Sequence, residues 1–311
     1  MRSARRTHPP TAIVKESMLS SVSQISNGDL AQIEANLHKQ ALAAQRTDRI
    51  VDRSAIAVGR AILIAMILGL WAYASGRWLD AESVSDPISV VRALADLIAT
   101  GRLWPQLWQT VVEVFAGYFA GAIAGAALAF GFAMMPGAER VMRPFLLALY
   151  SIPKIALAPL IVMWFGLGIA PKIILAGMFV FFIVFMNAVA GIQSVNRQHV
   201  NILRVMGAGR FAMIRKVVLP TMVPFLLLGL RISIPEAMTG AVIGEFISAS
   251  RGLGYLVYSA SNEMNTAVSF AALVVLVFVV AFADFGLGML ERFLPWQPAT
   301  SKTIRSGLRP R

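Results

Sequence analysis

The segment Lys172–Ile192 reads KIILAGMFVFFIVFMNAVAGI, with a single charged residue at its start. A helix needs about 20 apolar residues to cross the hydrocarbon core of a bilayer, and this segment has that length. Further candidate spans are roughly Ser54–Ser75, Leu107–Met135, Val141–Phe165, Thr221–Phe246 and Ser269–Glu291. The sequence therefore predicts an all-α integral membrane protein with six transmembrane helices.

The composition agrees with a membrane location. Of the 311 residues, 57% are hydrophobic and 14% are charged, whereas about a quarter of the residues of a soluble domain are charged. This argues against the soluble, disordered, collagen-like and disulfide-scaffold classes. The chain has no cysteine, so it can form no disulfide, thiolate metal site or cysteine nucleophile.

The basic residues predict the orientation. With the N-terminus inside, 21 lysine and arginine residues fall on the cytoplasmic side and 5 fall outside. Because cytoplasmic loops carry an excess of Lys and Arg, we expect both termini in the cytoplasm. The net charge of +12 then follows from topology and requires no nucleic acid.

This topology divides the chain into four parts. Residues 1–53 form a cytoplasmic N-terminal arm with an amphipathic helix, and residues 54–106 hold the first transmembrane helix and a periplasmic loop. Residues 107–292 form the transmembrane core, and residues 293–311 form a basic cytoplasmic tail. A short interfacial helix is expected in the periplasmic loop, on the stripe Val90, Val91, Leu94, Leu97 and Ile98.

Small residues recur at every fourth position of the second apolar stretch, at Gly117, Gly121, Gly125 and Ala129. Such spacing lets helix backbones approach closely in lipid. We expect tight packing of this face, against a helix of the same chain or of another.

The motifs of soluble enzymes are missing. The three histidines, His8, His38 and His199, are widely separated and form no metal-binding spacing. No GxxxxGK[ST] sequence exists, so a P-loop for ATP is excluded. We expect no catalytic residue, no metal site and no cofactor bound by this chain.

Charged residues inside membrane spans are costly, so they are candidates for function. Arg231, Glu236 and Glu245 lie in the fifth apolar stretch, and Lys154 lies in the third. In the simpler interpretation Arg231 reaches the inner interface and Glu245 sits at the outer edge. In the alternative, Arg231 or Lys154 lines a path for an anion. Arg231 and Glu245 are nearly four helical turns apart and are expected on about the same face.

Three further residues extend this hypothesis. Pro235 is expected to interrupt the fifth helix near the middle of the membrane. Met163 and Trp164 could contribute to a gate, or they could simply pack.

A polar segment at residues 193–220 lies on the cytoplasmic side and reads QSVNRQHVNILRVMGAGRFAMIRKVVLP. It predicts two short helices around Gly207, and Gly207 and Gly209 permit a sharp turn between them. Leu219 and Pro220 then begin the next span. The segment is either a connector on the membrane surface or a rigid knob for a cytoplasmic partner.

This segment resembles the EAA loop of binding-protein-dependent ATP-binding-cassette (ABC) importer permeases, with the pattern E-A-A-x3-G-x9-I-x-L-P. Gly207, Val217, Leu219 and Pro220 occupy the Gly, Ile, Leu and Pro positions. Asn201, Ile202 and Leu203 replace the Glu-Ala-Ala triplet.

Other segments between about 105 and 292 are similar to the nitrate/sulfonate/taurine permease family. They are Arg143-Pro144, the run from Ile152 to Leu160, Trp164 to Gly168, Gly229-Leu230-Arg231, Glu245 and Gly252-Leu253-Gly254-Tyr255.

The resemblance implies a type I ABC importer permease fold with a cytoplasmic coupling helix, in the bacterial inner membrane. It implies a permease dimer built of two copies, a cytoplasmic ATPase dimer that binds ATP and Mg, and a periplasmic binding protein. The solute would be small and anionic, such as a sulfonate, taurine or nitrate. The residues implied in ATPase coupling are Val200, Leu203, Arg204, Met206, Gly207, Ala208, Gly209, Arg210, Phe211, Leu219 and Pro220.

Two other functions remain open on the sequence. An ion-coupled secondary transporter would show hydropathy symmetry between its halves, and no convincing repeat is present. A membrane scaffold protein would explain the glycine stripe but not the charges within the spans.

Overall fold

The computed structural model describes residues 56, 58–78, 84–135 and 137–293. The N-terminal arm with its expected amphipathic helix, and the basic tail beyond residue 293, lie outside these residues. Residues 1–71 and 72–311 form two units, and each is considered by itself. The apolar helix Val58–Ala74 runs across the boundary between the two units. Its 17 residues make it about 26 Å long, shorter than the six-span prediction requires.

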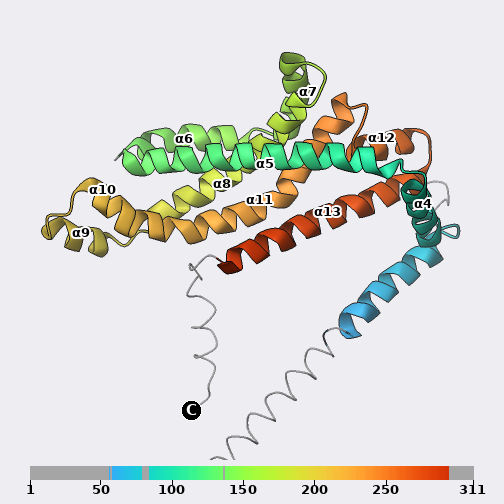
Figure 1. The fold of residues 1–311 in the computed structure, drawn as a ribbon, viewed down its shortest axis with the longest axis horizontal. Helices are drawn as coiled ribbons and strands as arrows, with labels where there is room; N and C mark the ends of the chain where they lie inside the picture. Colours follow the sequence, from blue (N-terminus) through green and yellow to red (C-terminus); the bar gives the residue numbers. More distant parts are fainter. Residues whose placement is uncertain (1–55, 57, 79–83, 136, 294–311) are drawn as a thin grey trace, which may run out of the picture. The chain divides into compact units, whose positions relative to one another are not determined.

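Four described helices are long and apolar enough to cross a membrane (Figure 1). They are α5 (Leu103–Met134), α8 (Ala170–Gln193), α11 (Leu219–Ser248) and α13 (Thr266–Phe293). They correspond to the second, fourth, fifth and sixth predicted spans. An all-α membrane fold is therefore confirmed, whereas the count of six is not.

Helix α8 is the centre of the second unit, because α5 and α11 both pack extensively against it. The predicted small-residue face of α5 is the contact surface. A Cβ atom on Gly117 would lie only 2.5 Å from the Cβ of Ala176, and one on Gly125 would lie 2.7 Å from the Phe181 carbonyl oxygen. Gly240 of α11 approaches Ala176 from the other side. The partner helix, left open by the sequence, belongs to the same chain.

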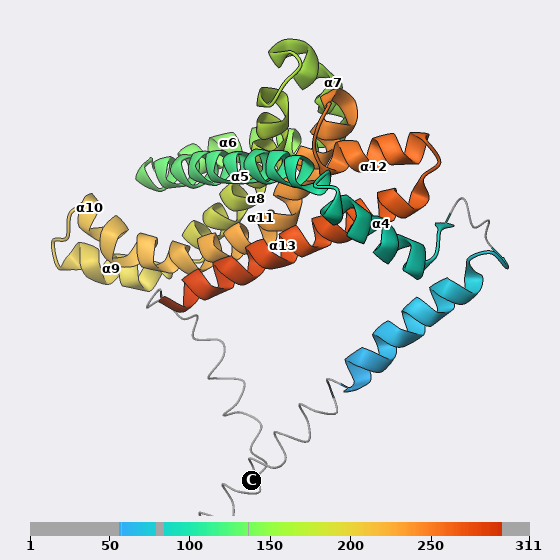
Figure 2. The same cartoon turned by 45° about the vertical axis from the view of Figure 1, so that its right-hand side comes forward.

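The third predicted span is not one straight helix. Residues 138–165 form α6 (Ala138–Ser151) and α7 (Lys154–Phe165), and the part Pro144–Ser151 of α6 is bent by 86° relative to α7. Ile152 between them is extended, with φ −67° and ψ 128°. A residue before proline avoids the helical region, and Pro153 follows Ile152 directly, so the chain turns here. Figures 1 and 2 both show α7 directed away from α6.

Two short helices pack at one end of the long ones. The expected interfacial helix is present as α4 (Pro87–Ala99), which begins where the Asp86 carboxylate accepts the backbone N–H groups of Ile88 and Ser89. Its Val90 and Leu97 are buried, and α4 packs on α13. The second short helix, α12 (Leu253–Asn262), packs on α13, α11 and α5.

Helix α11 remains continuous through Pro224 and Pro235, so the expected interruption at Pro235 is wrong. Each proline removes one backbone hydrogen bond, but extensive packing of α11 on α8 supports the helix at this point. The Pro235 carbonyl accepts a hydrogen bond from the Thr239 hydroxyl at 3.0 Å.

Candidate functional site

A helical loop, defined here as residues 197–218, connects α8 to α11. It consists of α9 (Arg197–Val205), α10 (Arg210–Met213) and the π-helical turn Ile214–Val218. The two short helices expected around Gly207 are therefore present. Asn196 begins α9 because its side chain accepts the backbone N–H of Gln198 at 2.8 Å. In Figures 1 and 2 this loop lies at the end of α11 opposite to α12.

Gly207 ends α9 in the left-handed conformation, with φ +75°. Its N–H donates to the Arg204 carbonyl at 3.0 Å, and the Ala208 N–H donates to the Leu203 carbonyl at 2.9 Å. These two bonds form the Schellman arrangement, which favours glycine at this position. A side chain at Gly207 would meet no other atom within 4 Å. The requirement for glycine is therefore conformational and not steric.

The helical loop exposes large apolar side chains at its tip. Val205 is 90% exposed, Met206 75% and Phe211 67%, and Ile202 is exposed as well. Ile214 is buried and attaches the loop to the bundle. Exposed apolar clusters of this kind mark interaction surfaces. The loop thus has a fixed turn and an uncovered apolar tip.

The structure gathers the predicted coupling residues on this loop and at the start of α11. Leu203 is partly buried and Arg204 is exposed on α9, and Arg210 is exposed on α10. Gly209 precedes α10 with ordinary extended backbone angles, φ −66° and ψ 163°. The others lie on the same short path: Val200, Met206, Gly207, Ala208, Phe211, Leu219 and Pro220.

Lys154 begins α7 at the bend described above and lies among aromatic rings. Its ammonium nitrogen is 4.4 Å from the ring centre of Tyr150, 5.6 Å from that of Phe179 and 5.4 Å from that of Phe182. A cation at such distances is attracted by the ring faces. Lys154 is partly exposed, so its charge is stabilised without being enclosed.

Arg231 forms an ion pair with Asp284 of α13. Its Nε atom lies 3.0 Å from one carboxylate oxygen, and Nη2 lies 3.1 Å from the other. The two side chains are 48% and 43% exposed. Arg231 was among the predicted pathway residues and Asp284 was not, although an acidic residue inside the sixth apolar stretch was a visible signal.

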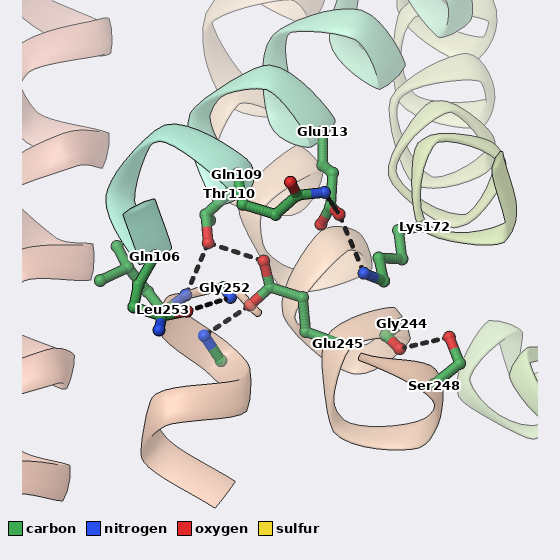
Figure 3. Close-up of polar contacts among 11 residues, drawn as sticks. Gln106, Gln109, Thr110, Glu113, Lys172, Gly244, Glu245, Ser248, Gly252 and Leu253 are labelled. Carbon is green, nitrogen blue, oxygen red and sulfur yellow. Dashed lines mark hydrogen bonds and ion pairs between the residues drawn. The ribbon is translucent and has the colours of Figure 1, made fainter. Parts of the chain in front are cut away.

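Glu245 lies at the far end of the same helix in a closed polar cluster (Figure 3). Its side chain is 1% exposed. One carboxylate oxygen accepts the Thr110 hydroxyl at 2.6 Å, and the other accepts the backbone N–H of Gly254. Thr110 in turn accepts the backbone N–H of Leu253 at 2.7 Å. Glu245 thus ties α5 to the first turn of α12.

Arg231 and Glu245 were expected on about the same face of one helix. In the structure, however, their surroundings differ completely. Arg231 contacts α13 on a half-exposed surface, whereas Glu245 is enclosed by α5 and α12. The helices that neighbour α11 change along its length, so sharing a face does not mean sharing an environment.

A buried charge pair lies beside Glu245, and neither of its members was among the predicted site residues. The Lys172 ammonium is 3.0 Å from one carboxylate oxygen of Glu113, and their side chains are 5% and 0% exposed. Gln109 donates to the same oxygen at 2.7 Å. Lys172, the charged residue at the start of the predicted span, lies in the first turn of α8. Figure 3 shows the pair directed toward each other between α5 and α8.

The remaining predicted pathway residues are not brought into this cluster. Met163 and Trp164 lie near the end of α7 and are 69% and 65% exposed. Glu236 is partly exposed on α11. In the part of the chain that the structure describes, no group of three or more acidic or histidine side chains could hold a metal ion.

Comparison with known proteins identifies the family. Residues 117–294, more than half of the chain, match the family described as binding-protein-dependent transport system inner membrane component. The chain belongs to this family. It is therefore an ABC importer permease for a small solute, and it is a multi-pass protein of the inner membrane. The alternatives of an ion-coupled transporter and a scaffold are set aside.

Curated relatives cover most of the chain. The riboflavin transport system permease protein RibX of Chloroflexus aurantiacus is 31% identical over 76% of this chain and 89% of its own length. The putative aliphatic sulfonates transport permease protein SsuC of Escherichia coli is 29% identical over 75% of this chain and 89% of its own. The taurine transport system permease protein TauC of Escherichia coli is 34% identical over 55% and 65%.

Solved structures agree on the fold. A chain of the methionine ABC transporter MetNI in an inward-facing conformation matches with a TM-score of 0.53 and 22% identity, over 61% of this chain and 94% of that one. A bacterial ABC transporter for the acidic polysaccharide alginate matches with a TM-score of 0.53 and 15% identity, over 85% and 99%. At these identities the likeness concerns the fold alone.

Proposed function

We propose that this permease imports a small anionic solute, such as a sulfonate, taurine or nitrate, that a periplasmic binding protein delivers. Two cationic side chains on membrane-spanning or adjacent helices support the proposal that the solute is an anion. Arg231 is half exposed on α11, and Lys154 is partly exposed at the start of α7. Cations inside a membrane protein face a protein interior or a water-filled cavity and mark solute pathways.

We further propose that the helical loop docks a cytoplasmic ATPase. The single observation that carries this assignment is the exposed apolar tip beside the left-handed turn at Gly207. Its arginines Arg204 and Arg210 suit the cytoplasmic side, on which basic residues concentrate. Both termini would then be cytoplasmic. ATP and Mg would bind to the ATPase, and a second copy of the permease would complete the pathway.

The mechanism follows from a rigid connection. The loop continues directly into α11 through the turn Ile214–Val218, and α11 packs against α8 along much of its length. When nucleotide brings two ATPases together, the docked loops would move with them. That movement would tilt α11 with its attached helices, and access to the solute pathway would change sides.

Two matched glycine variants test the docking. Gly207→Val places a β-branched residue at φ +75°, which it adopts only with strain, so the turn should distort. Gly207→Asn also adds a side chain, but asparagine adopts left-handed angles much more readily than valine, and a Cβ atom at this position meets no atom within 4 Å. The ATPase that co-purifies with the wild-type permease from native membranes is identified by its activity and by mass spectrometry.

We expect Gly207→Val to insert normally but to lose ATPase association and solute uptake together, whereas Gly207→Asn keeps both. Equal association in the two variants would refute the assignment of the loop. If Gly207→Val fails to insert, the turn serves folding instead, and the docking assignment loses its support.

A further inference from the structure

The Arg231–Asp284 ion pair lies near the middle of its two helices. Arg231 is the thirteenth of the 30 residues of α11, and Asp284 is the nineteenth of the 28 residues of α13. The two side chains keep 48% and 43% of their surfaces exposed. Charged groups at this depth would be strongly destabilised by contact with lipid. The exposed side of the pair must therefore face water or protein in the assembled transporter.

An apolar groove between α5, α11 and α13 is lined by residues that lie within one helical turn of the pair on α11 and α13. Its volume is about 240 Å³, larger than the 150 Å³ or so of a cavity that holds benzene. Ile234 and Leu287 line it, and each lies three residues after a member of the ion pair. A side chain on Gly286 would meet no atom within 4 Å, so the groove is open at this glycine.

The pair and the groove together fit an amphipathic anion. A guanidinium group binds a carboxylate, or a tetrahedral oxyanion such as a phosphate, through two parallel N–H···O bonds. Arg231 makes this arrangement with Asp284, with Nε and Nη2 each bonded to a separate oxygen. A solute oxyanion could take the same two donors without a change in the geometry of the guanidinium. Its alkyl or aryl part would then lie within reach of the groove.

We propose that Arg231 binds the anionic group of the transported solute in exchange for Asp284, and that the groove receives the apolar part of the solute. Asp284 is the resident counter-ion, which neutralises Arg231 when no solute is present and weakens solute binding so that the solute can be released. This inference rests on the proposed import of an anion and narrows the solute to an amphipathic one, such as a short alkylsulfonate.

The test measures binding of 1-butanesulfonate to the purified permease–ATPase complex by titration calorimetry, without the binding protein. In Asp284→Asn the competing carboxylate is gone, so binding should tighten by about tenfold, the size expected for one charged hydrogen-bond partner. In Arg231→Gln, binding should be lost. None of the forms should bind the neutral analogue butyl methyl sulfone as tightly as the wild type binds 1-butanesulfonate.

The groove is tested independently of the charge. Gly286→Phe should fill the groove and weaken binding of 1-butanesulfonate, while binding of methanesulfonate, which has almost no apolar part, should be affected far less.

The double variant Arg231→Asp/Asp284→Arg keeps an ion pair across the same two helices. It should retain anion binding even if either single charge change prevents folding.

The inference is overturned if Asp284→Asn binds 1-butanesulfonate no more tightly than wild type, or if Arg231→Gln still binds it. It is also overturned if neither wild type nor Asp284→Asn binds. In each case ATPase co-purification and uptake are measured on the same preparations. If ATPase co-purification and uptake are still observed, the proposed function stands. If the wild-type permease shows neither, the proposed function is refuted separately.

Discussion

The Glu245 carboxylate accepts the backbone N–H of Gly254, nine residues further along the chain, and so caps the N-terminus of α12 from the neighbouring helix α11. The contact explains why glycines flank Leu253. A Cβ atom on Gly254 would lie 2.6 Å from a Glu245 carboxylate oxygen, and one on Gly252 would overlap the same carboxylate. The acid and the two glycines therefore form one unit that fixes where α12 begins.

The first prediction concerns this unit. Glu245→Ala should destabilise the protein by about 1–3 kcal/mol for each donor left buried without an acceptor, namely the Gly254 N–H and the Thr110 hydroxyl. Glu245→Gln should cost less, because its amide oxygen can accept from Gly254 while its NH2 group donates to Thr110. Thermal unfolding of the purified permease in detergent measures both.

Two further variants test the contact between these residues: Gly254→Ala alone, and Gly254→Ala combined with Glu245→Ala. The single change crowds the carboxylate and should cost about 1–3 kcal/mol, but in the double variant most of the crowding is removed. The combined loss should thus be smaller than the sum of the two separate losses. Simple additivity would mean that the two residues do not interact.

The second prediction concerns the Lys172–Glu113 pair. Lys172→Met leaves the Glu113 carboxylate buried without its cation, which should cost about 3–5 kcal/mol. Lys172→Met combined with Glu113→Gln removes both charges and should recover much of this loss. Unfolding in detergent is again the measurement. A double variant no more stable than Lys172→Met would show that the charges are not coupled.

The third prediction uses two glycines of α5. Gly121→Ala should weaken or prevent the association of α5 with α8, because its Cβ would overlap the Gly177 backbone. Gly131→Ala, on the same helix, meets no atom within 4 Å and should be neutral or stabilising by about 0.5–1 kcal/mol. Similar yields and unfolding temperatures for both variants would contradict the packing described here.

Several of these features could be predicted from the sequence. Length and hydropathy located α5, α8, α11 and α13, because apolar helices of this size have few other environments. The spacing of Gly117, Gly121 and Gly125 identified a packing face, and Gly207 identified a turn. Each of these signals is local, since it depends on residues within one helix or one loop.

The features that were missed depend on contacts between distant segments. Glu113 and Lys172 are 59 positions apart, and a charge pattern alone does not say which acid meets which base. The bend between α6 and α7 was missed for another reason. Val141–Phe165 was predicted as one span, although Pro153 marks the break in the sequence.

Crosslinking from single cysteines tests the central claim most directly, because the chain contains no cysteine of its own. Val205→Cys places a thiol at the tip of the helical loop, and Met264→Cys places one beyond α12, on residues that are 90% and 62% exposed. The helical loop and α12 lie at opposite ends of α11, which is about 45 Å long. Each variant is treated in native membranes with a thiol–amine crosslinker. We predict an adduct with the ATPase from Val205→Cys and none from Met264→Cys. An ATPase adduct from Met264→Cys, with none from Val205→Cys, would contradict both the docking site and the orientation.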